Sequence, residues 1–175
     1  MRSPYVITLM NVYVIRYHQD DPKKCTARKM VSMGLAIDVK FPPRKSLILN
    51  PFSDKILHKG YKEKISGIVV LDLSWNKLKN NKTFTFNKSL NARLPLLFAG
   101  NPTNYAKPYI LSSVEAVAAS LYIFGFKSLS YKYLSIYKWG KTFLDLNMEI
   151  LDEYAIAGTE EEIRKIEENL ISKYR

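Results

Sequence analysis

Long apolar runs in the first hundred residues predict buried β-strands. The runs are YVITLMNVYVIRY at 5–17, SLILNPF at 46–52 and SGIVVLDLSW at 66–75, and RLPLLFAGN at 93–101 is predicted as a further buried strand or extended segment. Hydrophobic and polar residues do not alternate cleanly in these runs, as they would in a strand with one face in water. Such runs are typical of a parallel sheet that is buried on both faces.

A helical repeat of apolar positions replaces the strands after residue 112. The spacing predicts helices over 113–124, 128–154 and 159–174, and an earlier helix over 26–36 with Met33 on its inner side. Strands followed by a run of helices predict an α/β fold with a mainly helical second half.

A run of turn-forming residues separates the last predicted strand from the first C-terminal helix. Pro102 and Pro108 disfavour helix at the residues before them, so 100–109 is predicted to be a loop. Ser112 and Glu115 have the spacing of a capping box, which marks the start of the next helix. A loop of this length between buried elements is more often functional than idle. We therefore divide the chain into an α/β domain over 1–92 and a mainly helical domain over 93–175 that contributes this loop.

The charge balance points to a polyanionic partner. The 175 residues include 27 Lys and Arg against 16 Asp and Glu, a formal net charge of +11, and nine of the 16 acidic residues lie between Asp145 and Glu168. The first 130 residues are therefore more basic than the average, and nucleic acid is a better candidate partner than a membrane.

The cysteine count excludes several classes of site. Cys25 is the single cysteine, so the chain can form no internal disulfide and no zinc or iron–sulfur site built from several thiolates. The two histidines are too few for a His-based metal site. We expect no metal. No signal-peptide pattern or long uncharged apolar run is present, so we expect a soluble, cytoplasmic protein.

Three loops that follow apolar strands could form one ligand pocket. They are LNP at 49–51, LDLSWN at 71–76 and AGNPTNYAKP at 99–108. Ligands bind beyond the carboxyl ends of parallel strands, where these loops would meet. The sequence contains no GxGxxG and no phosphate-binding loop ending in Gly-Lys-Ser, so a nucleotide would have to be held by other means.

Individual residues of these segments have two interpretations each. Asp72 follows a buried strand directly, where burial could raise its pKa toward that of a general base, but the same side chain could cap the next turn. Trp75 could stack on an adenine ring or pack in the core. Lys23, Lys24, Arg28 and Lys29 could contact phosphates or form a solvated face, and the Tyr cluster at 131, 133 and 137 could stack bases or pack at helical spacing.

Five segments together resemble the small-subunit ribosomal RNA aminocarboxypropyltransferases in a short archaeal form. They are DPKKCT at 21–26, LNP at 49–51, LDLSWN at 71–76, RLPLLFAGNPTNYAKPYILSSVEAVAASLYIFGF at 93–126 and YKWGKTFLDLN at 137–147. The resemblance implies a fold like the SPOUT class of RNA-modifying enzymes, with a deep trefoil knot near the cofactor. It also implies transfer of the 3-amino-3-carboxypropyl group of S-adenosylmethionine to N3 of an N1-methylpseudouridine in small-subunit ribosomal RNA during ribosome biogenesis.

The resemblance further implies roles for individual residues. Asp72 would be the base for the uracil imide or the group that orients it, Leu71 would offer its carbonyl to the ribose, and Trp75 would shield the sulfonium methyl. The other expected cofactor contacts are Leu49, Pro51, Leu94, Tyr109 and Leu111 around the adenine, Lys23 and Thr26 beside the methionine carboxylate, and Ser113. The expected RNA contacts are Lys24, Arg28, Lys29 and Arg93.

Two other functions stay open at this point. A SPOUT-class RNA methyltransferase would use the same fold and cofactor, and a non-catalytic ribosome-assembly factor would use the basic segment Lys23–Lys29 alone. We expect a monomer, because the C-terminal helices can cover the hydrophobic face that related enzymes bury by dimerising.

Overall fold

The computed structural model describes residues 10–17, 25–73 and 89–175, and its centre is a five-stranded parallel sheet. Expected residues Lys23, Lys24 and Trp75 lie outside the described residues. The strands are β1 (Asn11–Arg16), β2 (Ile37–Asp38), β3 (Ser46–Leu49), β4 (Gly67–Asp72) and β5 (Leu90–Ala92). Their spatial order is β2-β1-β4-β3-β5, and each neighbouring pair is parallel. The apolar runs around 11–16, 46–49 and 67–72 thus form the strands that the sequence predicts.

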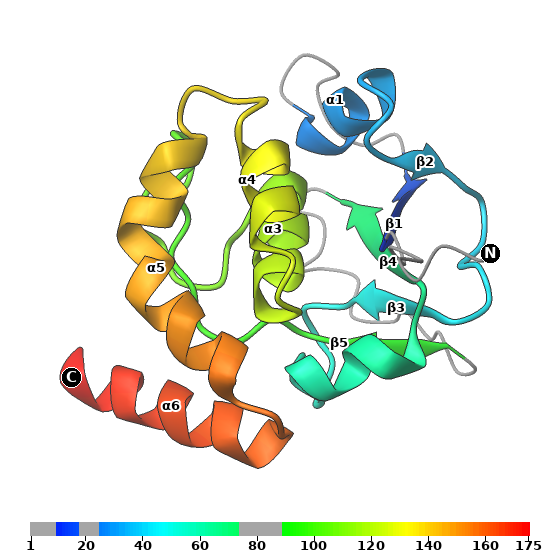
Figure 1. The fold of residues 1–175 in the computed structure, drawn as a ribbon. Helices are drawn as coiled ribbons and strands as arrows, with labels where there is room; N and C mark the ends of the chain where they lie inside the picture. Colours follow the sequence, from blue (N-terminus) through cyan, green and yellow to red (C-terminus); the bar gives the residue numbers. More distant parts are fainter. Residues whose placement is uncertain (1–9, 18–24, 74–88) are drawn as a thin grey trace, which may run out of the picture.

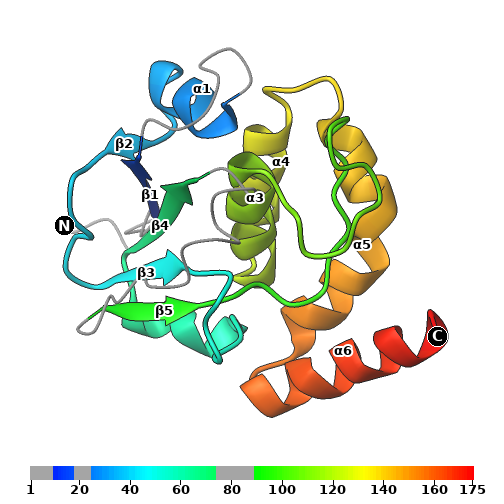
Figure 2. The same cartoon turned by 180° about the vertical axis from the view of Figure 1, so that it is seen from behind.

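Four helices follow the sheet along the chain. They are α3 (Ser113–Ile123), α4 (Lys127–Leu134), α5 (Gly140–Ile156) and α6 (Glu160–Lys173), whereas α1 (Thr26–Ser32) and the 3-10 helix η1 (Lys59–Lys64) lie between strands. α3 packs between the sheet and the pair α4 and α5, and α6 lies at the far end of α5 (Figures 1 and 2). α3 is buried almost all round because it lies in this middle layer, and its capping box is formed as predicted.

The predicted helix over 128–154 is wrong in one respect, because the chain breaks into α4 and α5. A β-carbon at Gly140 would lie 2.0 Å from the carbonyl oxygen of Leu134. The chain therefore turns tightly over residues 135–139, which a straight helix would not allow. The first helix is also shorter than predicted: α1 ends at Ser32, and Met33 is 52% exposed rather than on the inner side.

One large hydrophobic core joins the two halves of the chain. It contains residues from β1, β3 and β4 together with α3, α5 and α6, from Met10 to Ile163. A smaller cluster of Ile15, Ile48 and Val69 lies on the other face of the sheet. The strands β3 and β4 are buried on both faces, as their unbroken apolar runs predict.

Candidate functional site

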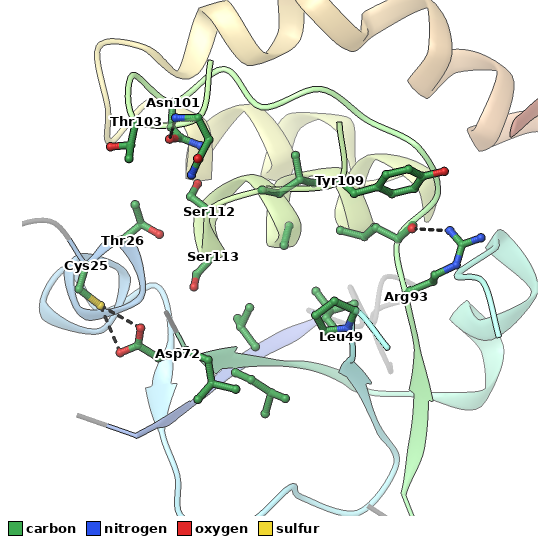
Figure 3. A pocket seen from close by; sticks show the side chains of 18 of the residues that line it. Cys25, Thr26, Leu49, Asp72, Arg93, Asn101, Thr103, Tyr109, Ser112 and Ser113 are labelled. Carbon is green, nitrogen blue, oxygen red and sulfur yellow. Dashed lines mark hydrogen bonds between the residues drawn. The ribbon is translucent and has the colours of Figure 1, made fainter. Parts of the chain in front are cut away.

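A pocket of about 720 Å³ opens at the carboxyl ends of β3 and β4. Its wall comes from the start of α1, the ends of these strands, the segment 93–116 and the connection between α4 and α5. The lining residues are Cys25, Thr26, Leu49, Pro51, Phe52, Val70, Leu71, Asp72, Leu73, Arg93, Leu94, Pro95, Asn101, Pro102, Thr103, Asn104, Tyr109, Leu111, Ser112, Ser113, Ala116, Tyr137 and Trp139. The three loops that the sequence analysis expected to meet thus do so (Figure 3).

The segment 93–112 forms much of the wall and folds back on itself. Backbone hydrogen bonds join Ala99 to Lys107 and Leu97 to Tyr109, each between an N–H and a carbonyl oxygen. Tyr109 has a φ of 65°, in the left-handed region that a residue with a β-carbon seldom adopts. Strain of this kind is found where surrounding contacts hold the backbone in place.

Glu115 supplies one such set of contacts. Its side chain is fully buried and accepts hydrogen bonds from Gly100 N–H (2.6 Å), Asn101 N–H (3.0 Å) and Asn101 Nδ2 (2.9 Å). It also accepts from the N–H and the hydroxyl of Ser112, both at 2.8 Å. One carboxylate on α3 therefore fastens the start of the predicted loop 100–109 to Ser112, which follows the loop.

A second carboxylate, Glu167 of α6, fastens the side of the pocket formed by Arg93 and Tyr109. Arg93 donates two hydrogen bonds to it, at 2.9 and 2.8 Å, and the Tyr109 hydroxyl and Leu96 N–H each donate at 2.9 Å. Burial acts to raise the pKa of Glu167, but the hydrogen bonds and positive charge of Arg93 outweigh it, so this pKa is lowered. Burial and Glu167 together raise the pKa of Tyr109 to about 12. α6 thus helps to shape the pocket although it does not line it.

Asp72 lies at the other end of the pocket, next to Cys25. It is 9% exposed, and the Cys25 thiol lies 3.2 Å from each carboxylate oxygen, so it can donate to either. Cys25 is also the N-cap of α1, since its sulfur accepts a hydrogen bond from Arg28 N–H. Desolvation by burial, with Asp72 adding to it, raises the pKa of the thiol to about 11. The thiol is therefore protonated at neutral pH and serves Asp72 as a donor.

Every expected cofactor contact that the structure describes lines this pocket. These are Thr26, Leu49, Pro51, Leu71, Leu94, Tyr109, Leu111 and Ser113, with Asp72 beside them. Thr26 and Ser113 each begin a helix, and the Thr26 hydroxyl accepts from Val114 N–H at 3.2 Å, so the starts of α1 and α3 are joined.

The expected RNA contacts differ in their surroundings. Arg28 is exposed. Lys29 donates to the carbonyl of Ile136 at 2.7 Å, and Arg93 is paired with Glu167. The positive charges of Lys29 and Arg93 thus already have partners within the protein.

Sequence reasoning missed four contributors to the site. Glu115 was recognised only as part of a capping box, and Cys25 only as a lone cysteine. Glu167 lies one helical turn after Ile163 on the apolar stripe of α6, and this buried position was a signal that could have found it. Trp139 was noted as part of the family motif at 137–147 and, with Gly140, as the mark of a bend or tight contact, but not as part of the site.

The residues present suit a ligand with an apolar ring system and a charged tail. Leu49 lies at the end of the pocket near Arg93 and Tyr109, while the hydroxyls of Thr26 and Ser113 and the carboxylate of Asp72 lie toward the other end (Figure 3). Leu71, Leu94 and Leu111 add to the apolar lining. Ligand pockets usually combine an apolar wall with a few placed polar groups in this way.

Two further properties of the described residues concern metal ions and membranes. They contain no group of three or more His, Cys, Asp or Glu side chains that could hold a metal ion. No helix among them is long and apolar enough to cross a membrane.

Two protein-family models match the chain. Residues 47–171 match "Ribosome biogenesis protein, C-terminal", and residues 10–41 match "Possible Fer4-like domain in RNase L inhibitor, RLI". Iron–sulfur clusters are usually held by four cysteines, and this chain has one. The residues of the second match therefore do not fit such a cluster.

Curated relatives and a solved structure cover nearly the whole chain. Proteins named 16S rRNA aminocarboxypropyltransferase are 46% identical in Saccharolobus islandicus and 41% identical in Methanothermobacter thermautotrophicus, over 94% and 93% of this chain and 98% and 99% of theirs. The structure of the SAM-dependent rRNA:acp-transferase Tsr3 from Vulcanisaeta distributa matches with a TM-score of 0.79 and 36% identity, over 94% of this chain and 97% of that one. The chain belongs to the family of ribosomal RNA aminocarboxypropyltransferases.

Proposed function

We propose that this protein transfers the 3-amino-3-carboxypropyl group of S-adenosylmethionine to N3 of an N1-methylpseudouridine in small-subunit ribosomal RNA. The observation that carries the proposal is the pocket at the carboxyl ends of β3 and β4. It combines an apolar wall with a buried carboxylate, Asp72, and is large enough for a donor and part of a nucleotide.

The apolar end of the pocket suits the adenosine of the donor. Leu49, Pro51, Leu94 and Leu111 offer apolar surface, and the left-handed backbone at Tyr109 fixes the course of this part of the wall. Leu71, at the end of β4, is placed for a ribose contact. Thr26 and Ser113, with Lys23 from outside the described residues, would hold the methionine carboxylate.

S-adenosylmethionine would supply an electrophilic carbon on its sulfonium: as N3 forms its bond to this carbon, the carbon–sulfur bond breaks and the thioether methylthioadenosine leaves. The chain's part is to present the carbon of the aminocarboxypropyl group, rather than the methyl, in line with N3 of the base. Trp75 is proposed to cover the methyl. Asp72 accepts the N3 proton or holds the uracil edge, and the Cys25 thiol fixes the orientation of its carboxylate.

Binding of the RNA would draw on the net charge of +11. Arg28, which is exposed on α1, and Lys24 are the proposed phosphate contacts. Lys29 and Arg93 would act through the pocket wall that they hold in place.

A double-label transfer assay tests the proposal. Small-subunit RNA that lacks the modification is incubated with S-adenosylmethionine labelled in the carboxyl carbon or in the methyl. Carboxyl label in the RNA, lost in Asp72→Asn, supports the proposal. Methyl label in the RNA would instead support an RNA methyltransferase, and no label in correctly folded RNA would support a non-catalytic assembly factor.

We further propose that the protein is a cytoplasmic monomer without metal and that its segment 93–126 takes part in a SPOUT-type trefoil knot. The division at residue 92 stays a prediction. Light scattering should give the mass of one chain, 20.2 kDa, at all concentrations, whereas a doubled mass would contradict the monomer. Pulling the unfolded chain by its two ends tests the knot, because a knotted chain stops short of the full contour length of about 3.3–3.6 Å per residue.

A further inference from the structure

Two stacked aromatic side chains of the pocket wall have no part in the proposed cofactor site. Tyr137 and Trp139 lie in the connection between α4 and α5, which reaches the same end of the molecule as α1 (Figures 1 and 2). Their rings are stacked, with centroids 4.7 Å apart and an angle of 25° between the planes. Both are half-buried and pack against the main core. The pair is therefore a fixed part of the wall.

Lys29 determines which of the two rings is available to a ligand. Its Nζ lies 4.2 Å from the centroid of the Tyr137 ring and donates to the carbonyl of Ile136 at 2.7 Å. Tyr137 thus lies against both a cation and the Trp139 ring, and Trp139 lines the pocket beside it. Tyr137 is therefore taken as the support and Trp139 as the ring that meets the ligand.

The tight turn before α5 places Trp139 where it is. Gly140 lies so close to the Leu134 carbonyl that only a glycine fits, with 2.0 Å between that oxygen and a β-carbon built at this position. Trp139 occupies the N-cap position of α5, directly before Gly140, and its side chain makes no capping hydrogen bond. A longer or looser turn would not hold the indole against Tyr137.

The aromatic pair belongs to the Asp72 end of the pocket. Lys29 lies one helical turn after Cys25 in α1, and the Cys25 thiol touches Asp72 at 3.2 Å. Figure 3 shows Cys25, Thr26 and Asp72 at one end and Leu49, Arg93 and Tyr109 at the other. The apolar end suits the donor's adenosine, and the Asp72 end would hold its aminocarboxypropyl group, so the aromatic pair lies beside the carbon that the accepting base must reach.

We propose that Trp139, supported by Tyr137 and Lys29, is the surface on which the target pyrimidine stacks. This inference rests on the proposed function. Stacking uses the face of the base and leaves its edge, where N3 lies, free to meet Asp72. Trp139 thus positions the accepting base and takes no part in binding the donor.

The test compares Trp139→Ala and Trp139→Phe with the wild-type protein. Trp139→Ala should raise KM for RNA and lower kcat/KM by about tenfold or more, the size of one lost base stack. The affinity for S-adenosylmethionine, measured by calorimetry without RNA, should stay unchanged. Trp139→Phe keeps a stacking ring and should recover most of the activity. Tyr174→Ala removes an aromatic ring that is 70% exposed and lies outside the pocket lining, and should match wild type in every measurement.

A fluorescence measurement covers the case in which Trp139→Ala fails to fold. The chain has two tryptophans, so Trp75→Phe leaves Trp139 as the single reporter. A short RNA containing the target site should quench its emission. Bound RNA without quenching would overturn the inference.

Two kinetic results would also overturn it. One is a Trp139→Ala variant with wild-type RNA kinetics, and the other is a Trp139→Ala variant that is folded but has lost affinity for S-adenosylmethionine, which would make Trp139 a donor contact. If the proposed function itself is wrong, the wild-type protein will transfer no carboxyl label to the RNA, which distinguishes that outcome from a wrong assignment of Trp139.

Discussion

Replacing Glu115 by Gln should destabilise the protein and weaken its pocket. The substitution keeps the size and shape of a side chain that is fully buried and holds Gly100, Asn101 and Ser112. One carboxylate oxygen accepts from the N–H groups of Gly100 and Asn101, and the other accepts from Asn101 Nδ2 and from Ser112. An amide nitrogen cannot accept at either position.

The magnitude follows from counting the donors that lose their acceptor. If the Gln nitrogen replaces the first oxygen, the N–H groups of Gly100 and Asn101 are left unsatisfied. If it replaces the second oxygen, Asn101 Nδ2 and Ser112 N–H are left without an acceptor, while the Ser112 hydroxyl can rotate to another partner. Each buried donor without a partner costs about 1–3 kcal/mol, so the free energy of unfolding should fall by about 2–6 kcal/mol.

Urea unfolding followed by circular dichroism measures the stability, and calorimetry measures the affinity for S-adenosylmethionine. A loss of this size should lower Tm by at least about 4 °C for a chain of this length. The dissociation constant should rise, because the fastened loop is a wall of the pocket. Glu149→Gln on the exposed face of α5 is the control. A Glu115→Gln variant within about 0.5 kcal/mol of wild type, as expected for the control, would refute the reasoning.

Further predictions concern three other contacts of the site. Cys25→Ala should cost about 1 kcal/mol in urea unfolding through the lost N-cap of α1, whereas Cys25→Ser should cost little, because a hydroxyl caps the helix and donates to Asp72. Burial raises the pKa of the Cys25 thiol to about 11, whereas its pKa in the unfolded chain is about 8.5. The protonated thiol therefore contributes stability that is complete below about pH 8.5 and is lost as pH rises through about 11. Alkylation of Cys25 should accordingly be slow at about pH 8 and fast near pH 11. Glu167→Gln should cost at least about 2 kcal/mol by leaving Arg93 without its carboxylate, and wild-type stability at neutral pH would contradict this. Gly140→Ala should lower the free energy of unfolding by about 1–3 kcal/mol despite the higher helix propensity of Ala, because its methyl group would overlap a backbone oxygen; an increase in Tm would contradict this.

The sequence by itself determined the features that depend on neighbouring residues. Apolar runs located β1, β3 and β4, the two prolines located the loop at 100–109, and Ser112 with Glu115 located the start of α3. Each of these signals acts over a few residues, through strand periodicity, the fixed φ of proline or a side-chain cap. The family motifs also selected residues that line one pocket.

Only the tertiary structure decided which distant side chains meet. Cys25 and Asp72 are 47 positions apart, and Arg93 and Glu167 are 74 apart, so no local pattern could pair them. The break between α4 and α5 was foreseen only in part: Gly140 inside a helical pattern indicates a bend or a tight contact, but only the structure shows that the contact is with the Leu134 carbonyl and that the helix is interrupted there. Local sequence sets the hydrogen bonding and periodicity within an element, but packing around one shared core decides which elements touch. Trp139 lines the pocket only because this packing brings the connection between α4 and α5 to the ends of the strands.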